Sequence, residues 1–123
     1  MRPALARRLG RVVALLAVAS CGGSPAAPAC PTFPTTCTSP PGPSYATDVA
    51  PIIQARCATA NCHSPTGMEP NRPYQTYTEI SKFQIDILIQ VRACRMPPAG
   101  AEPLSMDEQA TLLAWLYCGG MDN

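Results

Sequence analysis

The sequence predicts an all-α fold, because three segments carry apolar residues at helical spacing and no segment alternates apolar and polar residues as a strand does. The chain has 123 residues, which is room for one domain. It also has seven cysteines and 15 prolines, a high content for this length. Small exported domains of this composition are usually stabilised by disulfides or by a bound group, so we expect a thin helical core with such support.

The first predicted helix runs from about Asp48 to Cys57. Thr47 can cap it, and the negative charge of Asp48 favours the positive end of its dipole. Pro51 lies near the start, where proline is tolerated. This helix should therefore deliver the chain directly to Cys57.

The second predicted helix covers residues 79–92 and begins after Thr78. Apolar residues cover much of its circumference, which suggests burial against more than one neighbouring element. These residues are Ile80, Phe83, Ile85, Ile87, Leu88, Ile89 and Val91. Either a small hydrophobic core or a bound apolar group would bury such a helix.

The third predicted helix follows Ser105, which forms an S-x-x-E capping box with Glu108. It ends near Tyr117, where Gly119 and Gly120 offer a left-handed cap. Proline-rich loops separate the helices, so the predicted domain consists of helices and stiff connections.

Residues 1–20 resemble a bacterial export signal. Arginines precede an apolar run that is too brief to span a bilayer. The run ends in Val18-Ala19-Ser20-Cys21, which resembles the lipobox of bacterial lipoproteins, where the cysteine receives lipid. We therefore expect an exported protein of the cell envelope or periplasm, lipid-anchored to a membrane through Cys21. The alternative is an ordinary secretory signal.

Residues 21–43 form the predicted lipid-anchored linker, and residues 44–123 the folded domain. Seven prolines lie between residues 22 and 43, which is typical of an extended, semi-rigid tether. Cys30 and Cys37 lie within the tether, and in an oxidising compartment we expect them to form a disulfide with each other.

The charge of the chain is unevenly distributed. Net charge is +1, but four of the nine basic residues lie in the first eleven positions. From Cys21 onward five basic residues stand against eight acidic ones, a net charge of −3. With no basic face, we expect no nucleic-acid partner, and protein partners that are basic at their docking patch.

The residues with the clearest chemistry are Cys57, Cys62 and His63, the only histidine. Two nearby thiols followed directly by an imidazole are typical of covalent haem attachment, in which the thiols form thioethers and the imidazole binds the iron. The usual spacing is C-x-x-C-H, whereas four residues separate these cysteines. We expect the longer spacer to bulge outward while both sulfurs reach the haem; whether Cys57 forms its bond stays open.

A haem iron in an electron carrier usually needs a sixth ligand, and with one histidine the remaining soft donors are methionines. Met1 is removed with the signal, Met106 starts a helix, and Met121 lies at the C-terminus. Met68 follows the cysteine motif too closely to reach the opposite face easily. We therefore expect Met96, on a loop stiffened by two prolines, to bind the iron. The alternative is that Met96 fills a gap in the core.

The order of helix, C…C-H motif, apolar helix, Met-Pro-Pro loop and C-terminal helix resembles a class I cytochrome c domain of bacterial lipoproteins. The phrases DVAPIIQARC, MPP and LLAWLYCGG carry the resemblance, which covers most of the mature chain. It implies a small helical domain around one covalently bound haem c. Cys57 and Cys62 would be the attachment points, and His63 and Met96 the axial ligands.

The resemblance also suggests a use for every cysteine. With Cys21 lipidated and two cysteines on the haem, four disulfide candidates remain: Cys30, Cys37, Cys94 and Cys118. We favour a bond between Cys94 and Cys118, which would stabilise the domain by about 3 kcal/mol and hold the methionine loop. Four cysteines allow three connectivities, so this pairing is a preference.

The sequence thus predicts a monohaem c-type cytochrome that carries single electrons between redox partner proteins and is not an enzyme. The family's aromatic packing in the last helix falls on Trp115 or Tyr117. One alternative is a haemless, disulfide-stapled lipoprotein that acts as an interaction module, with Cys57 bonded to Cys62. Others are a haem-based ligand sensor without the methionine ligand, and a zinc site, which is disfavoured because Cys62 and the adjacent His63 cannot easily both reach one ion.

Overall fold

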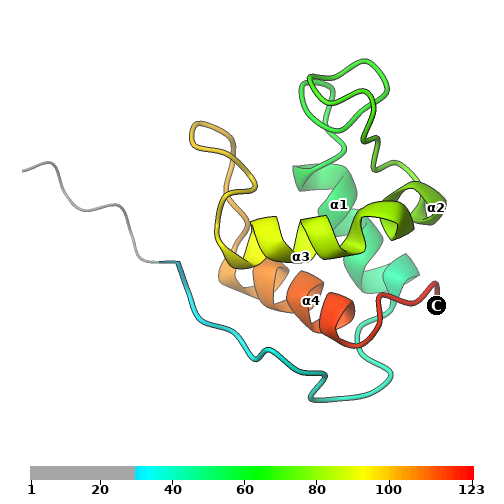
Figure 1. Ribbon diagram of the computed structural model, residues 1–123, viewed down its shortest axis with the longest axis vertical. Helices are drawn as coiled ribbons and strands as arrows, with labels where there is room; N and C mark the ends of the chain where they lie inside the picture. Colours follow the sequence, from blue (N-terminus) through cyan, green and yellow to red (C-terminus); the bar gives the residue numbers. More distant parts are fainter. Residues whose placement is uncertain (1–29) are drawn as a thin grey trace, which may run out of the picture.

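The computed structural model describes residues 30–123 (Figure 1). The predicted signal peptide of residues 1–20, the lipidation at Cys21 and the start of the linker lie outside the described residues. Within residues 30–123 the chain forms helices and no strand, which confirms the all-α prediction. None of the helices in this part is long and apolar enough to cross a membrane.

Three helical stretches follow one another where the sequence predicts helices. The first begins as a π-helical turn, η1 (Tyr45–Val49), and continues as α1 (Ala50–Arg56). The second comprises α2 (Tyr77–Ile80), a 3-10 turn η2 (Ser81–Phe83), and α3 (Gln84–Arg92). The third is the regular helix α4 (Met106–Tyr117).

The residues that cap these helices agree only in part with the prediction. Ser105 and Glu108 form the predicted capping box at the start of α4. The first stretch begins one turn earlier than expected, because Ser44 rather than Thr47 caps it. Thr76 caps α2 in a second capping box with Glu79, in place of Thr78. In both cases a hydroxyl residue two or three positions earlier is the cap, so the helical stretch begins slightly earlier than predicted.

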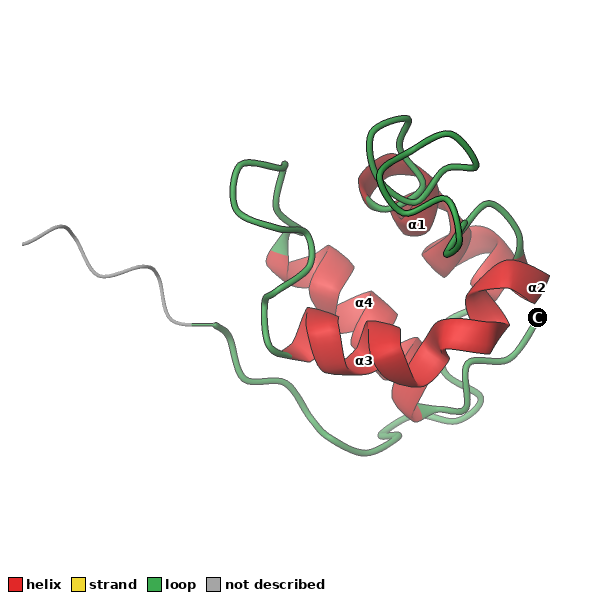
Figure 2. Ribbon diagram, turned by 45° about the horizontal axis from the view of Figure 1, so that its top comes forward, coloured by secondary structure: helices red, strands yellow, loops and turns green. Residues whose placement is uncertain are grey.

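The core lies where α4 packs against α3 and η1 (Figure 2). Its most completely buried side chains come from all three helical stretches: Val49, Ile53, Ile80, Leu112, Leu113 and Trp115. Trp115 is the buried aromatic residue of α4, and its Nε1–H donates to the carbonyl oxygen of Met121 at 2.9 Å. Tyr117 is only partly buried against the same core.

The second stretch is less widely buried than the sequence suggests. Ile80, Ile87 and Val91 are at most 5% exposed and form its inner face. Ile85 and Ile89 are 73% and 49% exposed, so the expectation that they widen the buried face is wrong. One apolar stripe of α3 therefore faces solvent.

The described half of the predicted linker, residues 30–43, contains no helix or strand but is bonded to the domain at two points. We call it the strap. Disulfides join Cys30 to Cys94 and Cys37 to Cys118. The four cysteines are those predicted, but the expected pairs Cys30–Cys37 and Cys94–Cys118 are wrong. The bonded cysteines are 64 and 81 positions apart in the sequence, so each bond closes a long loop. A disulfide across a loop of this length can stabilise a fold by on the order of 4 kcal/mol.

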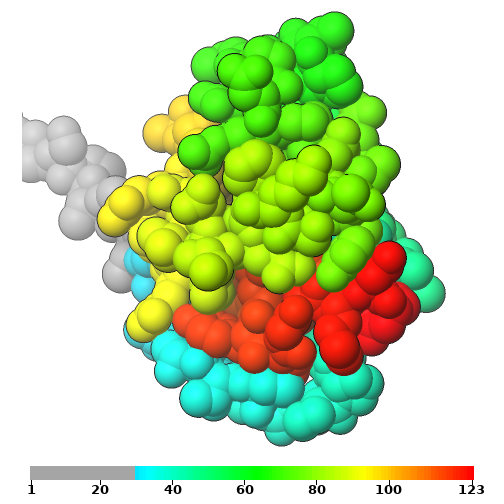
Figure 3. All heavy atoms as spheres, turned by 45° about the vertical axis from the view of Figure 1, so that its right-hand side comes forward, coloured from blue at the N-terminus to red at the C-terminus, as the bar shows by residue number. Residues whose placement is uncertain are grey.

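The strap also packs closely on the domain (Figure 3). Phe33 is partly buried against the hydrophobic core. Gly42, at φ +86°, approaches Cys118 so closely that a Cβ atom there would lie 2.6 Å from the Cys118 Cβ. The residue after the strap, Ser44, donates its hydroxyl to the carbonyl oxygen of Asn123 at 2.7 Å. This part of the linker is therefore a fixed component of the fold.

Candidate functional site

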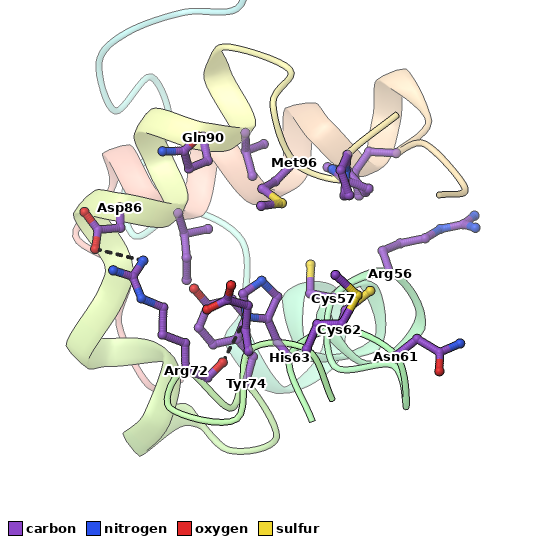
Figure 4. A pocket seen from close by; sticks show the side chains of 17 residues that line it. Arg56, Cys57, Asn61, Cys62, His63, Arg72, Tyr74, Asp86, Gln90 and Met96 are labelled. Atoms are coloured by element: carbon purple, nitrogen blue, oxygen red, sulfur yellow. Dashed lines mark hydrogen bonds and ion pairs between the residues drawn. The ribbon is translucent and has the colours of Figure 1, made fainter. Parts of the chain in front are cut away.

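The four residues that the sequence singles out for chemistry line one pocket of about 270 Å³. Cys57 and Cys62 come from the segment after α1, and His63 follows them (Figure 4). Met96 comes from the methionine loop, residues 93–105, and lies on the wall opposite His63 (Figure 4). The apolar side chains that line the pocket include Ile87, Val91 and Leu104.

Backbone hydrogen bonds fold the cysteine segment into a compact turn. The amide of His63 donates to the carbonyl oxygen of Cys57 at 3.0 Å, so the two ends of the motif are adjacent. The amide of Cys62 donates to the carbonyl oxygen of Thr59 at 3.0 Å, while Ala60 and Asn61 are exposed. Within the four-residue spacer, Ala58 is buried in the core and Asn61 lies at the edge of the pocket lining, and both cysteines line the pocket.

The next turn of chain closes over this segment. Gly67 lies against the backbone of Cys62, where a Cβ atom would meet the Cys62 carbonyl oxygen at 2.1 Å. The amide of Glu69 donates to that same carbonyl oxygen at 3.2 Å. Ser64 is buried and donates to the carbonyl oxygen of Ala60 at 3.2 Å. Only glycine fits at position 67 without moving the cysteine segment.

The imidazole of His63 is held by its Nδ1 atom, which lies 2.9 Å from the carbonyl oxygen of Arg72. A carbonyl can only accept, so this contact places a proton on Nδ1, and in the neutral ring the lone pair is then on Nε2. The ring also stacks on Tyr74, with centroids 4.1 Å apart. A neutral imidazole fixed in this tautomer is prepared to bind a metal through Nε2.

Cys57 and Cys62 are free thiols, whereas the other four cysteines of residues 30–123 are in disulfides. The third disulfide of the haemless alternative, between Cys57 and Cys62, is therefore not formed. Burial raises the pKa of the Cys57 thiol to about 12, and the neighbouring Cys62 adds to the shift. Cys57 is consequently a neutral thiol at any physiological pH.

The methionines separate into two groups. Met96 and Met68 line the pocket, whereas Met106 and Met121 do not and are 66% and 46% exposed. Met68 is 83% exposed and follows His63 by five residues in the sequence. Met96 is 38% exposed and faces the pocket from the other wall (Figure 4). His63 and Met96 thus line the same pocket, and Met68 is a further methionine in its lining.

Two ion-pair networks connect the elements around the pocket. Arg56 at the end of α1 pairs with Glu102 in the methionine loop and with Glu108 in α4. Arg72 pairs with Asp86 of α3 at 3.5 Å, and its guanidinium lies 5.4 Å from the centroid of the Phe83 ring. These contacts couple the wall that holds the cysteines to the wall that holds Met96.

Within residues 30–123, no three His, Cys, Asp or Glu side chains are grouped so that they could hold a metal ion. The zinc alternative lacks its further ligands, because every described cysteine outside the motif is in a disulfide. A haem iron needs only one ligand on each face, so this grouping is not required for it.

Comparisons with protein-family models, with curated proteins and with solved structures find no match to this chain.

Sequence reasoning missed three contributors to the site. Tyr74 stacks on His63, the Arg72 carbonyl holds the imidazole, and Arg56 joins the two walls. A backbone carbonyl leaves no trace in a sequence. The sequence could have indicated a role for Arg56, because it directly precedes Cys57 and is one of only five basic residues after the signal region.

Proposed function

We propose that this chain is a monohaem c-type cytochrome that carries single electrons between redox partners at the cell envelope. The observation that carries the proposal is the convergence of two free thiols, an imidazole and a thioether on one pocket. Their chemical types match what covalent haem attachment and two axial positions require. The proposal agrees with the resemblance of the sequence to class I cytochrome c domains.

The residues present fit a haem in specific respects. His63 has its Nε2 lone pair available, because Nδ1 donates to the Arg72 carbonyl. Cys57 and Cys62 lie on the same wall as His63, and Met96 lies opposite (Figure 4). When bound, the haem would supply one-electron redox chemistry, and a methionine axial ligand would favour a high reduction potential. The protein would contribute attachment, axial ligation and an apolar surrounding.

The proposed location follows from the disulfides and the N-terminal sequence. Two disulfides are compatible with an exported protein, because reducing compartments keep thiols reduced. We propose that Cys21 carries the lipid anchor. Radiolabelled lipid should be incorporated into the full chain and not into Cys21→Ala, and equal labelling of both would contradict the anchor.

The cofactor is tested by mass and colour. We expect mature protein made together with a haem-attachment system to be red, to keep its haem through acid–acetone extraction and to have the mass of the polypeptide plus one haem. In Cys57→Ser and Cys62→Ser each remaining cysteine should retain a single thioether. A colourless product with the polypeptide mass alone would contradict the proposal and favour the haemless interaction module.

The axial ligand is tested by a matched set of methionine variants. Met96→Ala should lower the reduction potential and let exogenous ligands bind the iron. Met106→Ala, outside the pocket, should change neither property. If Met68→Ala rather than Met96→Ala has the effect, the axial role belongs to Met68.

A haem-based ligand sensor is the second candidate, and the 38% exposure of Met96 is the observation that favours it. A weakly held thioether at the surface can be displaced by small ligands. Binding of carbon monoxide by the unmodified reduced protein at micromolar concentration would favour the sensor, whereas binding only in Met96→Ala would favour the electron carrier.

A further inference from the structure

The disulfide between Cys30 and Cys94 reaches the chain two residues before Met96. Cys94 is the point where the chain leaves α3 and turns toward the pocket. It is the one non-glycine residue between positions 30 and 123 with a positive φ, at 52°. Left-handed backbone is unfavourable for a residue with a side chain and persists where surrounding contacts hold it.

Several contacts hold this turn in place. The amide of Cys94 donates to the carbonyl oxygen of Val91 at 3.1 Å, and the amide of Arg95 donates to that of Gln90 at 2.9 Å. The buried side chain of Gln109 in α4 donates to the Val91 carbonyl at 2.9 Å and lies 3.4 Å from the Cys94 sulfur. The disulfide to Cys30 adds a covalent contact on the outer side of the same turn.

Beyond the turn the methionine loop has few contacts of its own. The amide of Met96 makes one long hydrogen bond, 3.4 Å, to the carbonyl oxygen of Gln90. The following residues are largely exposed until Glu102 pairs with Arg56 and Leu104 packs on the core. The position of Met96 in the pocket therefore depends mainly on the direction that Cys94 gives to the chain.

The strap is fixed independently of Cys94. Cys37 is bonded to Cys118, Phe33 packs on the core, and Gly42 lies in contact with Cys118. The strap can thus act as a rigid support for the turn at Cys94 (Figure 1).

We propose that the strap is a positioning element for Met96 and acts through the Cys30–Cys94 disulfide. Met96 is the group expected to contact the iron, so this inference rests on the proposed function; Cys30 and Cys94 act only through it. Without the bond the loop gains freedom, and the effective concentration of the Met96 sulfur in the pocket falls.

The matched test compares two double variants of the full chain. Cys30→Ser with Cys94→Ser removes the bond at the methionine loop, and Cys37→Ser with Cys118→Ser removes the bond at the end of α4. Both lose a disulfide that closes a loop of similar length, so both should lose similar stability. We expect the first to lower the reduction potential and to raise the affinity for exogenous imidazole by about tenfold, and the second to have a much smaller effect, because Phe33 still holds the strap on the core. Equal effects in both variants, or none in the first, would overturn the proposal.

A third variant covers the case in which the first does not fold. Inserting two glycines after Cys94 keeps both disulfides but separates Met96 from the turn. We expect the same lower potential and higher imidazole affinity, and an unchanged potential would overturn the proposal.

Oxidation of the haem-free full chain gives a readout that needs no iron. Under dilute hydrogen peroxide, the ratio of sulfoxide at Met96 to that at exposed Met106 should rise several-fold without the Cys30–Cys94 bond and much less without the Cys37–Cys118 bond. If no haem attaches, the proposed function fails, yet this ratio still decides whether the strap positions Met96. An unchanged ratio in both variants would overturn the strap inference alone.

Discussion

The imidazole of His63 lies face to face with the ring of Tyr74, with centroids 4.1 Å apart and planes inclined by 15°. Tyr74 is itself only 6% exposed, and its amide donates to the carbonyl oxygen of His63 at 3.0 Å. The Arg72 carbonyl fixes one edge of the imidazole, while the tyrosine ring fixes its plane. The two contacts together leave the imidazole little freedom to rotate.

Replacing Tyr74 should therefore change the orientation of His63. Tyr74→Phe keeps an aromatic face, so we expect the haem-loaded variant to retain the electron paramagnetic resonance spectrum of the ferric wild-type protein. Tyr74→Leu keeps apolar bulk but loses the flat face, and its spectrum should broaden as the imidazole samples several orientations. Burial raises the pKa of the Tyr74 hydroxyl, so the phenol stays neutral in these measurements. Identical spectra for Tyr74→Leu and the wild type would show that the stacking has no positioning role.

The partly buried thiol of Cys57 should react slowly with alkylating reagents in the haem-free protein. Its pKa rises from 9.0 to about 12, so at pH 8 the thiolate fraction is about a thousandfold smaller than in the unfolded chain. Iodoacetamide labelling followed by peptide mass spectrometry, with and without urea, measures this ratio. The disulfide cysteines should remain unlabelled and serve as an internal control. Labelling of Cys57 in the folded chain within tenfold of the rate in urea would contradict the burial.

The same shift has a consequence at high pH. Because the folded pKa lies above the unfolded value, the native state binds more protons than the unfolded state between about pH 9 and pH 12. This group's contribution to stability is complete below pH 9 and is lost as the pH rises through that window.

Glu108 should make the protein sensitive to acid. Hydrogen bonding to the Ser105 backbone, followed by the hydrogen bond and charge of Arg56, lowers the pKa of its carboxyl below 4.5. A lowered folded pKa stabilises the protein above the unfolded value, and this contribution is lost as the pH falls. Glu108→Gln keeps a capping side chain but removes the charge, so its unfolding free energy should fall less between pH 7 and pH 3.5 than that of the wild type.

Glu69→Gln is a suitable control for this measurement, because Glu69 forms no ion pair with the described residues. It should lose as much stability in acid as the wild type. Urea unfolding at the two pH values decides the point, and parallel behaviour of Glu108→Gln and the wild type would contradict the lowered pKa of Glu108.

The parts of the fold that the sequence predicts well depend on local interactions. The capping box of Ser105 and Glu108 needs only four consecutive residues, and it is present. The equivalent box of Thr76 and Glu79 has the same spacing, but Thr78 offered a competing cap nearby. The disulfide pairing could not be predicted in this way, because each bond joins residues more than 60 positions apart. It depends on where the strap lies, and no residue pattern specifies that.

For the candidate site, a sequence can indicate side-chain chemistry but not the contacts that the backbone makes. Cys57, Cys62, His63 and Met96 were named from their types and spacing, and they line one pocket. The contact that fixes the imidazole comes from a backbone carbonyl, which every residue possesses.

The two faces of α3 should respond very differently to truncation. Ile87 is 5% exposed and packs in the core, whereas Ile85, two positions earlier, is 73% exposed. Removing the buried side chain leaves a cavity, so Ile87→Ala should lower the unfolding free energy by about 2–4 kcal/mol. Ile85→Ala, the matched control in the same helix, should change it by less than about 0.5 kcal/mol. Urea denaturation of the oxidised, haem-free protein measures both. Similar losses in the two variants would mean that the outer stripe of α3 is covered in solution, contrary to the exposed face that the structure shows.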